Sequence, residues 1–478
     1  MAQRRSKRDE GGTRRLWSIV RAPLRAAPAI PMPRFLLFVI VFSEGFCSLG
    51  AEVIALRQII PHLGSSIVVT APTIGFFLLA LAFGYHAGAR VDVDFRAVVG
   101  RNFLFAAVLT GAGLSGIVVD LLFAAVEPAV VAYLFLVGGV LCPIAWLLGQ
   151  TVPILTNLLR YQRVGEASGE ALYWSTLGSF LGSLSLSLLV MQWLGVSAAV
   201  ALCALLLLAG FVLLSAQTWT TSLAGIVGGG VIIAANIWLR PQIETAYASY
   251  LLAPANYEGA INGRALKNNN SIASLIDDSE PPRYARYIHH IRSLLVDELA
   301  FRGRQILVLG AGGFTLSHRE PRNHYTYVDI DPAVREIAEK RFLHQAARGD
   351  FVADDARRFV AHAGQRYAAV VVDVYSSHSS IPGHLVTREF WLATRRVLES
   401  EGVLIANLIL DSALATPYAR NLLATIESAY GRCAVEVLQK KQVLANVIVI
   451  CRSGILPEPA RLFLDERNTA DFDLARSR

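Results

Sequence analysis

Long apolar runs fill the first half of the chain and restrict its fold more than any other feature. About seven runs are long enough to cross a bilayer as helices, because a span needs ~20 mostly apolar residues. They lie at 35–57, 67–89, 102–123, 128–150, 171–192, 197–215 and 222–239. Over all 478 residues, 54% are hydrophobic and only 17% are charged, which argues against a soluble two-domain protein. The sequence therefore predicts a polytopic helical membrane domain followed by a soluble part.

The residues before the first run form a basic tail, which supplies much of the formal net charge of +7. Its basic residues are Arg4, Arg5, Lys7, Arg8, Arg14, Arg15, Arg21 and Arg25. Others follow the second and fourth runs, namely Arg90, Arg96, Arg101, Arg160 and Arg163. Basic flanks stay on the cytoplasmic side, so we predict a cytoplasmic N-terminus and no nucleic-acid partner. Because no small-residue cleavage site follows the first run, we expect it to be a retained span.

Two features stand out inside the predicted spans. Glu44 and Glu52 lie in the first run, where an ionisable side chain pairs with another group, faces a cavity or binds a cation. Structural pairing and a functional role both remain open for them. In the fifth run, Gly178 and Gly182 stand four residues apart among serines, a pattern that lets two helices approach closely. We therefore expect this stripe to pack against another helix.

The second half alternates short apolar runs with helical stretches, which predicts a parallel sheet covered by helices on both faces. Strands are expected at 305–309, 325–329, 350–353, 368–373 and 402–406, and helices at 332–344, 355–362, 387–399 and 415–430. The final two strands should form an antiparallel edge. An asparagine-rich stretch, 256–278, is interpreted as a linker that leads into a small β element at 271–276. We therefore divide the chain into a basic tail (1–34), a transmembrane domain (35–240), a linker with a β element (241–304), a Rossmann-like domain (305–453) and a polar C-terminal tail (454–478).

A glycine-rich turn ends the first strand of the soluble part. Gly310, Gly312 and Gly313 follow the strand, and Asp329 ends the next strand roughly 20 positions later, the spacing of a nucleoside-binding βαβ unit. Glycines let the backbone approach the ligand, and the carboxylate of Asp329 accepts hydrogen bonds from both ribose hydroxyls. A nucleoside cofactor is therefore expected.

Other acidic residues follow the next strands, at Asp354, Asp355 and Asp373. In an open α/β sheet the ligand lies at the carboxyl ends of the strands, so these side chains should gather at one edge. Gathered carboxylates favour a cationic ligand. Each has a second interpretation, because Asp355 is placed to cap a helix beginning at Ala356 and Asp373 to hold a turn.

The cysteines are Cys47, Cys142, Cys203, Cys433 and Cys451, and they lack the spacing of a metal site, so no metal is expected. Three of them fall within predicted spans and are interpreted as structural. If the last two strands pair as a hairpin, Cys433 and Cys451 lie nearly opposite each other, which would permit a disulfide.

From about residue 305 to residue 407, the order of motifs resembles the spermidine synthase (polyamine aminopropyltransferase) family in its membrane-fused form. The matching segments are the turn from Gly310 to Thr315, Val328-Asp329-Ile330-Asp331-Pro332, Asp355-Ala356, the valine run from Tyr367 to Asp373, and 381–390. The membrane half is similar at 148–153 and 172–182. The resemblance implies a class I methyltransferase-type fold and an enzyme that transfers an aminopropyl group from decarboxylated S-adenosylmethionine to an amine.

The same resemblance implies roles for single residues. Asp373 would be the catalytic base, and Tyr375 and Ser376 would contact the amine substrate. The residues that would hold the cofactor are Gly310, Gly312, Asp329, Asp355 and Ala356. Asp329 would hold the ribose, and Asp355 would meet the adenine amino group.

The sequence also departs from the family pattern on the amine side. Gly313 stands where the family turn has an acid, Ser376 replaces the second acid of its D-x-x-D loop, and 271–274 lacks its glutamine motif. Ordinary synthesis of spermidine from putrescine is therefore in doubt. The alternatives are an S-adenosylmethionine-dependent methyltransferase, or a non-catalytic nucleoside- or polyamine-binding sensor or transporter.

The expected partners are a small amine and the lipid bilayer, and a homo-oligomer is compatible with the sequence. The expected location is the cytoplasmic (inner) membrane, with several passes. Seven spans from a cytoplasmic N-terminus would place the soluble domain outside, yet the implied cofactor is made in the cytosol. We therefore expect a cytoplasmic soluble domain and one miscounted span.

Overall fold

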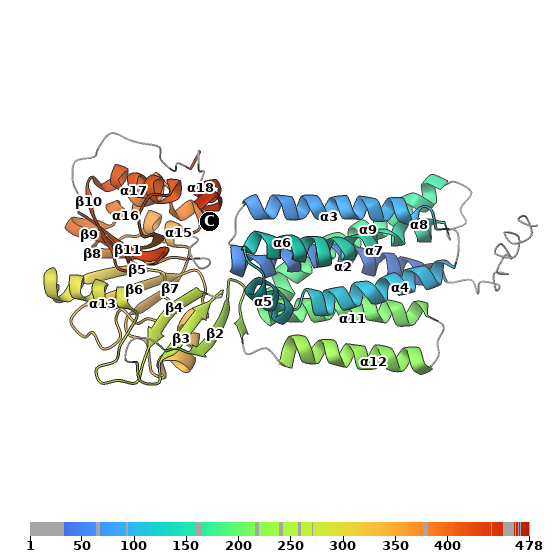
Figure 1. The fold of residues 1–478 in the computed structure, drawn as a ribbon, viewed down its shortest axis with the longest axis horizontal. Coiled ribbons are helices and arrows are strands. Elements are labelled where there is room, and N and C mark those ends of the chain that lie inside the picture. The colour runs from blue at the N-terminus through green and yellow to red at the C-terminus, as the bar shows by residue number, and fades with distance from the viewer. Residues whose placement is uncertain are drawn as a thin grey trace, which may run out of the picture.

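A bundle of long helices lies beside a part made of strands and shorter helices, which adjoins one end of the bundle (Figure 1). The computed structural model describes residues 33–63, 67–91, 94–157, 164–215, 219–238, 242–256, 260–269, 271–375, 381–440, 442–452, and 463–477 except 464, 467 and 469. The basic tail and Ser376 lie outside these residues, as do Arg160 and Arg163.

The bundle contains most of the predicted apolar runs as helices. Its elements are α2 (Arg34–Leu63), α3 (Ile67–Gly88), α4 (Phe95–Val108) with η1 (Leu109–Gly113), α5 (Gly116–Ala125), α6 (Ala129–Leu136) with η2 (Val137–Leu141), α7 (Cys142–Gly149), α8 (Thr151–Thr156), α9 (Val164–Ser185) with η3 (Leu186–Val190), α10 (Met191–Leu194), α11 (Val196–Leu214), and α12 (Trp219–Ile233) with η4 (Ala234–Trp238). Among the described residues, 6 helices are long and apolar enough to cross a membrane. The last predicted run corresponds to a shorter apolar helix, Leu223–Trp238.

The third predicted run, 102–123, is not one helix, and that prediction is wrong. The helix begins earlier, at Phe95, and ends at Gly113, while α5 is a separate short helix. Ser115 lies between them in an extended conformation, with φ −62° and ψ 134°. Because Gly111 and Gly113 weaken the helix just before this point, the chain turns here although its hydropathy continues.

The glycine stripe of α9 packs against α2, as its spacing predicts. A Cβ atom added to Gly178 would lie 2.2 Å from the carbonyl oxygen of Phe42, and one added to Gly182 would lie 2.4 Å from that of Phe46. Only glycine permits this approach of the two backbones. In the same contact, the Ser175 hydroxyl donates a hydrogen bond to Glu44 at 2.9 Å, so Glu44 is paired within the bundle.

A seven-stranded sheet forms the centre of the soluble part, in the order β10-β11-β9-β8-β5-β6-β7. The strands are β5 (Gln305–Leu309), β6 (His324–Asp329), β7 (Asp350–Ala353), β8 (Tyr367–Val372), β9 (Leu398–Asp411), β10 (Cys433–Val437) and β11 (Leu444–Arg452). Strands β5 to β9 pair in parallel, and β10 and β11 form the antiparallel edge. The predicted Rossmann-like fold is confirmed for this domain.

Helices cover both faces of this sheet. They are α13 (Arg286–Ser293) with η5 (Leu294–Glu298), α14 (Val334–Ile337) with η6 (Ala338–Leu343), α15 (Ala356–His362), η7 (Gly383–Leu385), α16 (Arg388–Arg396) and α17 (Pro417–Tyr430). Alternate residues of β5 enter different cores: Leu307 packs in the cluster of Trp391, whereas Val308 packs in that of Phe342. This two-sided burial explains why the parallel strands are continuous apolar runs.

The segment interpreted as a linker is more ordered than the sequence predicts. It contains a four-stranded antiparallel sheet, with β1 (Ile243–Glu244), β2 (Ser249–Pro254), β3 (Arg264–Asn268) and β4 (Ser271–Ile276). Strand β3 is hard to recognise in the sequence because several of its residues are polar, but its Leu266 is fully buried. The C-terminal region also packs on the domain, through buried Phe463 and α18 (Ala470–Ser477).

The hairpin of β10 and β11 pairs Cys433 directly with Cys451. The two residues form a disulfide, while the described Cys47, Cys142 and Cys203 are free. The pairing inferred from the sequence is therefore present in the structure.

Candidate active site

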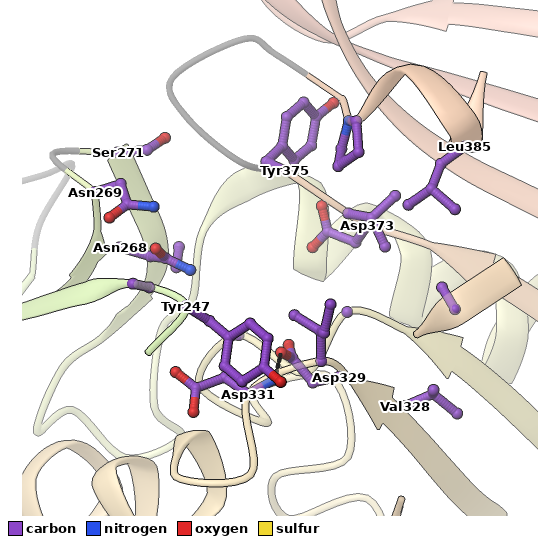
Figure 2. Close-up of a pocket in the computed structure, with 18 of the residues that line it drawn as sticks. Tyr247, Asn268, Asn269, Ser271, Val328, Asp329, Asp331, Asp373, Tyr375 and Leu385 are labelled. Atoms are coloured by element: carbon purple, nitrogen blue, oxygen red, sulfur yellow. Dashed lines mark hydrogen bonds between the residues drawn. The ribbon is translucent and has the colours of Figure 1, made fainter. Parts of the chain in front are cut away.

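A cavity of about 430 Å³ opens at the carboxyl ends of the parallel strands. It lies where β5 is flanked by β6 on one side and β8 on the other, which is the topological switch point of the sheet. Asp329 and Asp373 lie on the sheet side of this cavity, and Asn268, Asn269 and Ser271 lie across from them (Figure 2). All five predicted cofactor-binding residues line it, namely Gly310, Gly312, Asp329, Asp355 and Ala356.

The turn after β5 requires glycine for two reasons. Gly310 has φ +91°, and a Cβ atom there would lie 2.1 Å from the carbonyl oxygen of Asp373. Gly312 has φ +50°, and Phe314 also has a positive φ, of 55°. Because these angles alternate with ordinary ones, the chain forms turns from 312 to 319 and no helix connects β5 to β6. The prediction of a βαβ unit is therefore wrong for the connection between β5 and β6, which contains turns in place of a helix.

Asp329 ends β6 and is held by the backbone on both of its oxygens. Oδ2 accepts a hydrogen bond from the N–H of Ala311 at 2.9 Å, and Oδ1 accepts one from the N–H of Asp331 at 3.0 Å. Burial raises the pKa of this carboxyl, while the two N–H groups oppose the shift. Each oxygen has a second lone pair, so the carboxylate can still receive two ribose hydroxyls.

Asp355 caps a helix, as one interpretation of its position predicts, and it also lies at the cavity wall. Its Oδ1 accepts a hydrogen bond from the N–H of Arg358 at 2.9 Å and so caps α15. Its Oδ2 lies 3.0 Å from Nε2 of His384, at the cavity wall. Burial tends to raise the pKa of Asp355, but the hydrogen bonds from Arg358 and His384 outweigh it and lower the pKa. The neighbouring Asp354 instead pairs with Arg358.

Asp373 follows β8 and is clamped by two side chains from distant segments. The Tyr287 hydroxyl donates to Oδ2 at 2.9 Å, and Nδ2 of Asn407 donates to Oδ1 at 2.8 Å. Asn446 in turn donates to Oδ1 of Asn407 at 3.0 Å. Burial raises the pKa of Asp373, although Asn407 and Tyr287 both act to lower it. A buried, oriented carboxylate of this kind suits proton transfer.

Sequence reasoning missed the residues that hold Asp373. The available signal was weak: Asn407 interrupts the apolar strand β9, and Asn446 interrupts the neighbouring strand β11, two residues away from the position opposite Asn407. A polar side chain on an otherwise buried strand needs a partner, which here is the carboxylate. Tyr287 gives no comparable signal, because it lies on α13, far from Asp373 in the sequence.

The amine-side predictions have mixed outcomes. Tyr375 lines the cavity, but its hydroxyl is engaged by β9, donating to the carbonyl of Asn407 at 2.8 Å and accepting from the N–H of Ile409 at 2.7 Å. Ser376 lies outside the described residues. At Gly313, an added Cβ atom would lie 2.4 Å from the ring of Phe342, so no acidic side chain fits at this backbone position.

Comparison with known proteins places these residues in context. No protein-family model matches the chain. Polyamine aminopropyltransferase 1 of Streptomyces coelicolor is 25% identical, across 94% of this chain and 92% of the relative. The chain is thus similar, over nearly its whole length, to a polyamine aminopropyltransferase. The resemblance to the polyamine aminopropyltransferases that the motifs predicted is thereby confirmed, while the fusion to a membrane domain stays a prediction.

A polyamine aminopropyltransferase of Vibrio vulnificus is more similar over a shorter region, with 38% identity. That match covers 27% of this chain and 44% of the relative. Among solved structures, a probable spermidine synthase from Corynebacterium glutamicum has 18% identity and a TM-score of 0.38, and the match covers 49% of this chain and 85% of that chain.

Proposed function

We propose that the protein is a transferase that moves an aminopropyl group from decarboxylated S-adenosylmethionine to a small amine. The observation that carries the proposal is the pair of carboxylates in one cavity: Asp329 placed for a ribose, and Asp373 clamped at the switch point. The names of the curated relatives support the same activity.

The bound donor would supply a sulfonium, whose adjacent propyl carbon is open to attack. Asp373 would accept a hydrogen bond from the acceptor amine and take its proton as the new C–N bond forms. The C–S bond breaks, its electron pair neutralises the sulfonium, and methylthioadenosine leaves. Tyr287 and Asn407 would keep the carboxylate in place, so orientation contributes much of the acceleration.

Methyl transfer from S-adenosylmethionine is the second candidate, and the absence of an acidic side chain at Gly313 favours it. The acid that this family places there would contact substrate amines, yet a side chain at Gly313 would collide with Phe342. A donor that retains its carboxylate, or an acceptor that needs no second acid, is compatible with that change.

One assay separates the two candidates. The purified protein is incubated with S-adenosylmethionine or its decarboxylated form, together with a panel of mono- and diamines. Aminopropyl transfer yields methylthioadenosine, whereas methyl transfer yields S-adenosylhomocysteine. If neither product forms with any amine, the enzymatic proposal fails and a binding role takes its place.

We infer further that the helical bundle crosses the cytoplasmic membrane, with the lipid bilayer as its partner. Its orientation follows from α2, whose Arg57, near the C-terminal end, contacts the carbonyls of Thr245 and Ala246 beside the soluble domain. The N-terminal end of this 30-residue helix, about 45 Å long at 1.5 Å per residue, therefore lies away from that domain.

Helix α9 runs parallel to α2, because Gly178 meets Phe42 and Gly182 meets Phe46. Its first residues are thus also remote from the soluble domain. Arg90 and Arg96 flank the connection of α3 to α4 at the same end. Basic flanks favour the cytoplasm, which supports a soluble domain outside it, opposite to the cytoplasmic side expected from cofactor supply.

A further inference from the structure

The C-terminal end of the membrane helix α2 forms part of the cavity wall. Arg57 and Ile60, in its last turns, line the same cavity as Asp329 and Asp331. The Nη2 atom of Arg57 donates to the carbonyl of Thr245 at 3.4 Å and to that of Ala246 at 3.3 Å. A residue of the bundle therefore holds the hairpin between β1 and β2.

The hairpin in turn contacts Asp331, which is hydrogen-bonded to Asp329, the carboxylate proposed to bind the ribose. The Thr245 hydroxyl donates to Oδ2 of Asp331 at 2.6 Å, and Oδ1 of Asp331 accepts from the N–H of Ala333 at 2.9 Å. Asp331 is only 2% exposed, and its own N–H donates to Asp329 at 3.0 Å. A series of hydrogen bonds thus runs from Arg57 in α2, through Thr245 and Asp331, to Asp329.

A second contact fixes the hairpin to the bundle. Glu244 accepts hydrogen bonds from the backbone N–H and the hydroxyl of Ser197, both at 2.9 Å, at the start of α11. The hairpin that contains Thr245 and Ala246 is therefore fixed to the bundle and cannot move freely with Asp331. Because hydrogen bonds hold the hairpin both to the bundle and to Asp331, a change at the bundle end is transmitted to Asp329.

We propose that Arg57 is a positioning residue for the nucleoside: it fixes Thr245 against Asp331 and thereby orients Asp329, so that the membrane bundle completes the cofactor site. This inference rests on the proposed function only in taking the cavity as a nucleoside site. It goes further in making cofactor affinity depend on a residue of the membrane domain.

The test uses the full chain in detergent or nanodiscs and methylthioadenosine as the probe. Arg57→Gln removes the guanidinium charge and shortens the side chain, so that its donors no longer reach the hairpin, and Thr245→Val removes the hydroxyl next to Asp331. Each should weaken binding by about fivefold or more, the usual lower range for coupling between sites. Arg57→Lys, which keeps a donor, should recover part of the loss. Arg101→Gln, at an exposed position within α4, is the matched control and should bind like wild type.

Kinetics and a double variant separate positioning from general damage. With an active amine, KM for the donor should rise in Arg57→Gln while kcat at saturation stays nearly unchanged. Arg57→Gln combined with Thr245→Val should lose no more affinity than the stronger single variant, because both break one network. Wild-type affinity in both single variants, or fully additive losses, would overturn the positioning role alone. A wild-type protein that does not bind methylthioadenosine would overturn the nucleoside site as well.

Discussion

At the scale of single residues, Asp329 and Asp373 divide the expected chemistry between them. Asp329 is bonded to two backbone N–H groups and lines the cavity, whereas Asp373 is bonded to two side chains. Changes at the first should therefore affect binding, and changes at the second should affect turnover. The two carboxylates can be tested independently.

Asp329→Asn removes the charged acceptor and should weaken methylthioadenosine binding by about 1.5–3 kcal/mol, the range for hydrogen bonds to a charged group. Asparagine keeps one oxygen for a backbone N–H, so the turn should still form. Calorimetric titration measures the loss, and circular dichroism serves as the folding control. Unchanged affinity would remove Asp329 from the cofactor site.

Asp373→Asn keeps the shape of the side chain but removes the base, so turnover should fall by roughly 10²–10⁴. Methylthioadenosine affinity should stay close to wild type. The raised pKa of Asp373 means that its ionised form opposes folding at neutral pH, so this variant should not lower the unfolding temperature. Full activity with any accepted amine would exclude Asp373 as the base.

Tyr287→Phe tests the pH dependence of the same group. Because burial raises the pKa of Asp373, the ionised base is lost as pH falls through that raised value, and kcat/KM should decline on the acid side. The Tyr287 hydroxyl acts to lower this pKa, so its removal should move the acid limb to higher pH. A pH–rate profile of both proteins makes the comparison. An acid limb that stays in place would show that another group limits the rate.

At the scale of elements, the sequence patterns located most helices and strands but not all of their ends. The strand at 305–309 was predicted to the residue, since a buried parallel strand is one short apolar run. The break at Ser115 was not predicted, because hydropathy continues through it and only the packed backbone turns. Strand β3 was missed because its polar residues conceal a single buried leucine.

The contact between α2 and α9 gives an element-scale prediction. Gly178→Ala places a methyl group 2.2 Å from the carbonyl of Phe42 and should destabilise the bundle by about 1–3 kcal/mol through overpacking. Gly169→Ala, in the same helix, has no atom within 4 Å of the new methyl and is the matched control. Thermal unfolding in detergent measures both. Equal stability of the two variants would show that the close contact is not maintained in the protein.

At the scale of the whole molecule, residues of the bundle and of the soluble domain line one cavity. If the basic end of the bundle faces the cytoplasm, the active site lies outside it, and the sulfonium donor must be delivered across the bilayer. The disulfide between Cys433 and Cys451 is consistent with an oxidising compartment.

Sidedness is tested in intact cells. A reporter that is active only in the cytosol, fused after Arg478, should be silent. Cys433 and Cys451 should react with a thiol reagent only after reduction. Cys451→Ser is the control, since it leaves Cys433 without its disulfide partner. An active reporter, together with two reduced thiols, would return the soluble domain to the cytoplasm.

The sequence alone determined the apolar helices, the order of strands and helices, and the acidic residues that end successive strands. These are local patterns, and parallel strands bring their carboxyl ends to one edge whatever else the chain does. The tertiary structure decided which other side chains surround the acidic residues at the carboxyl edge of the sheet. Tyr287, Asn407 and Arg57 reach the site from distant segments, and their approach depends on strand register, the glycine turn and the packing of α2 against the hairpin. No local pattern encodes such contacts, because each requires the rest of the fold to be in place.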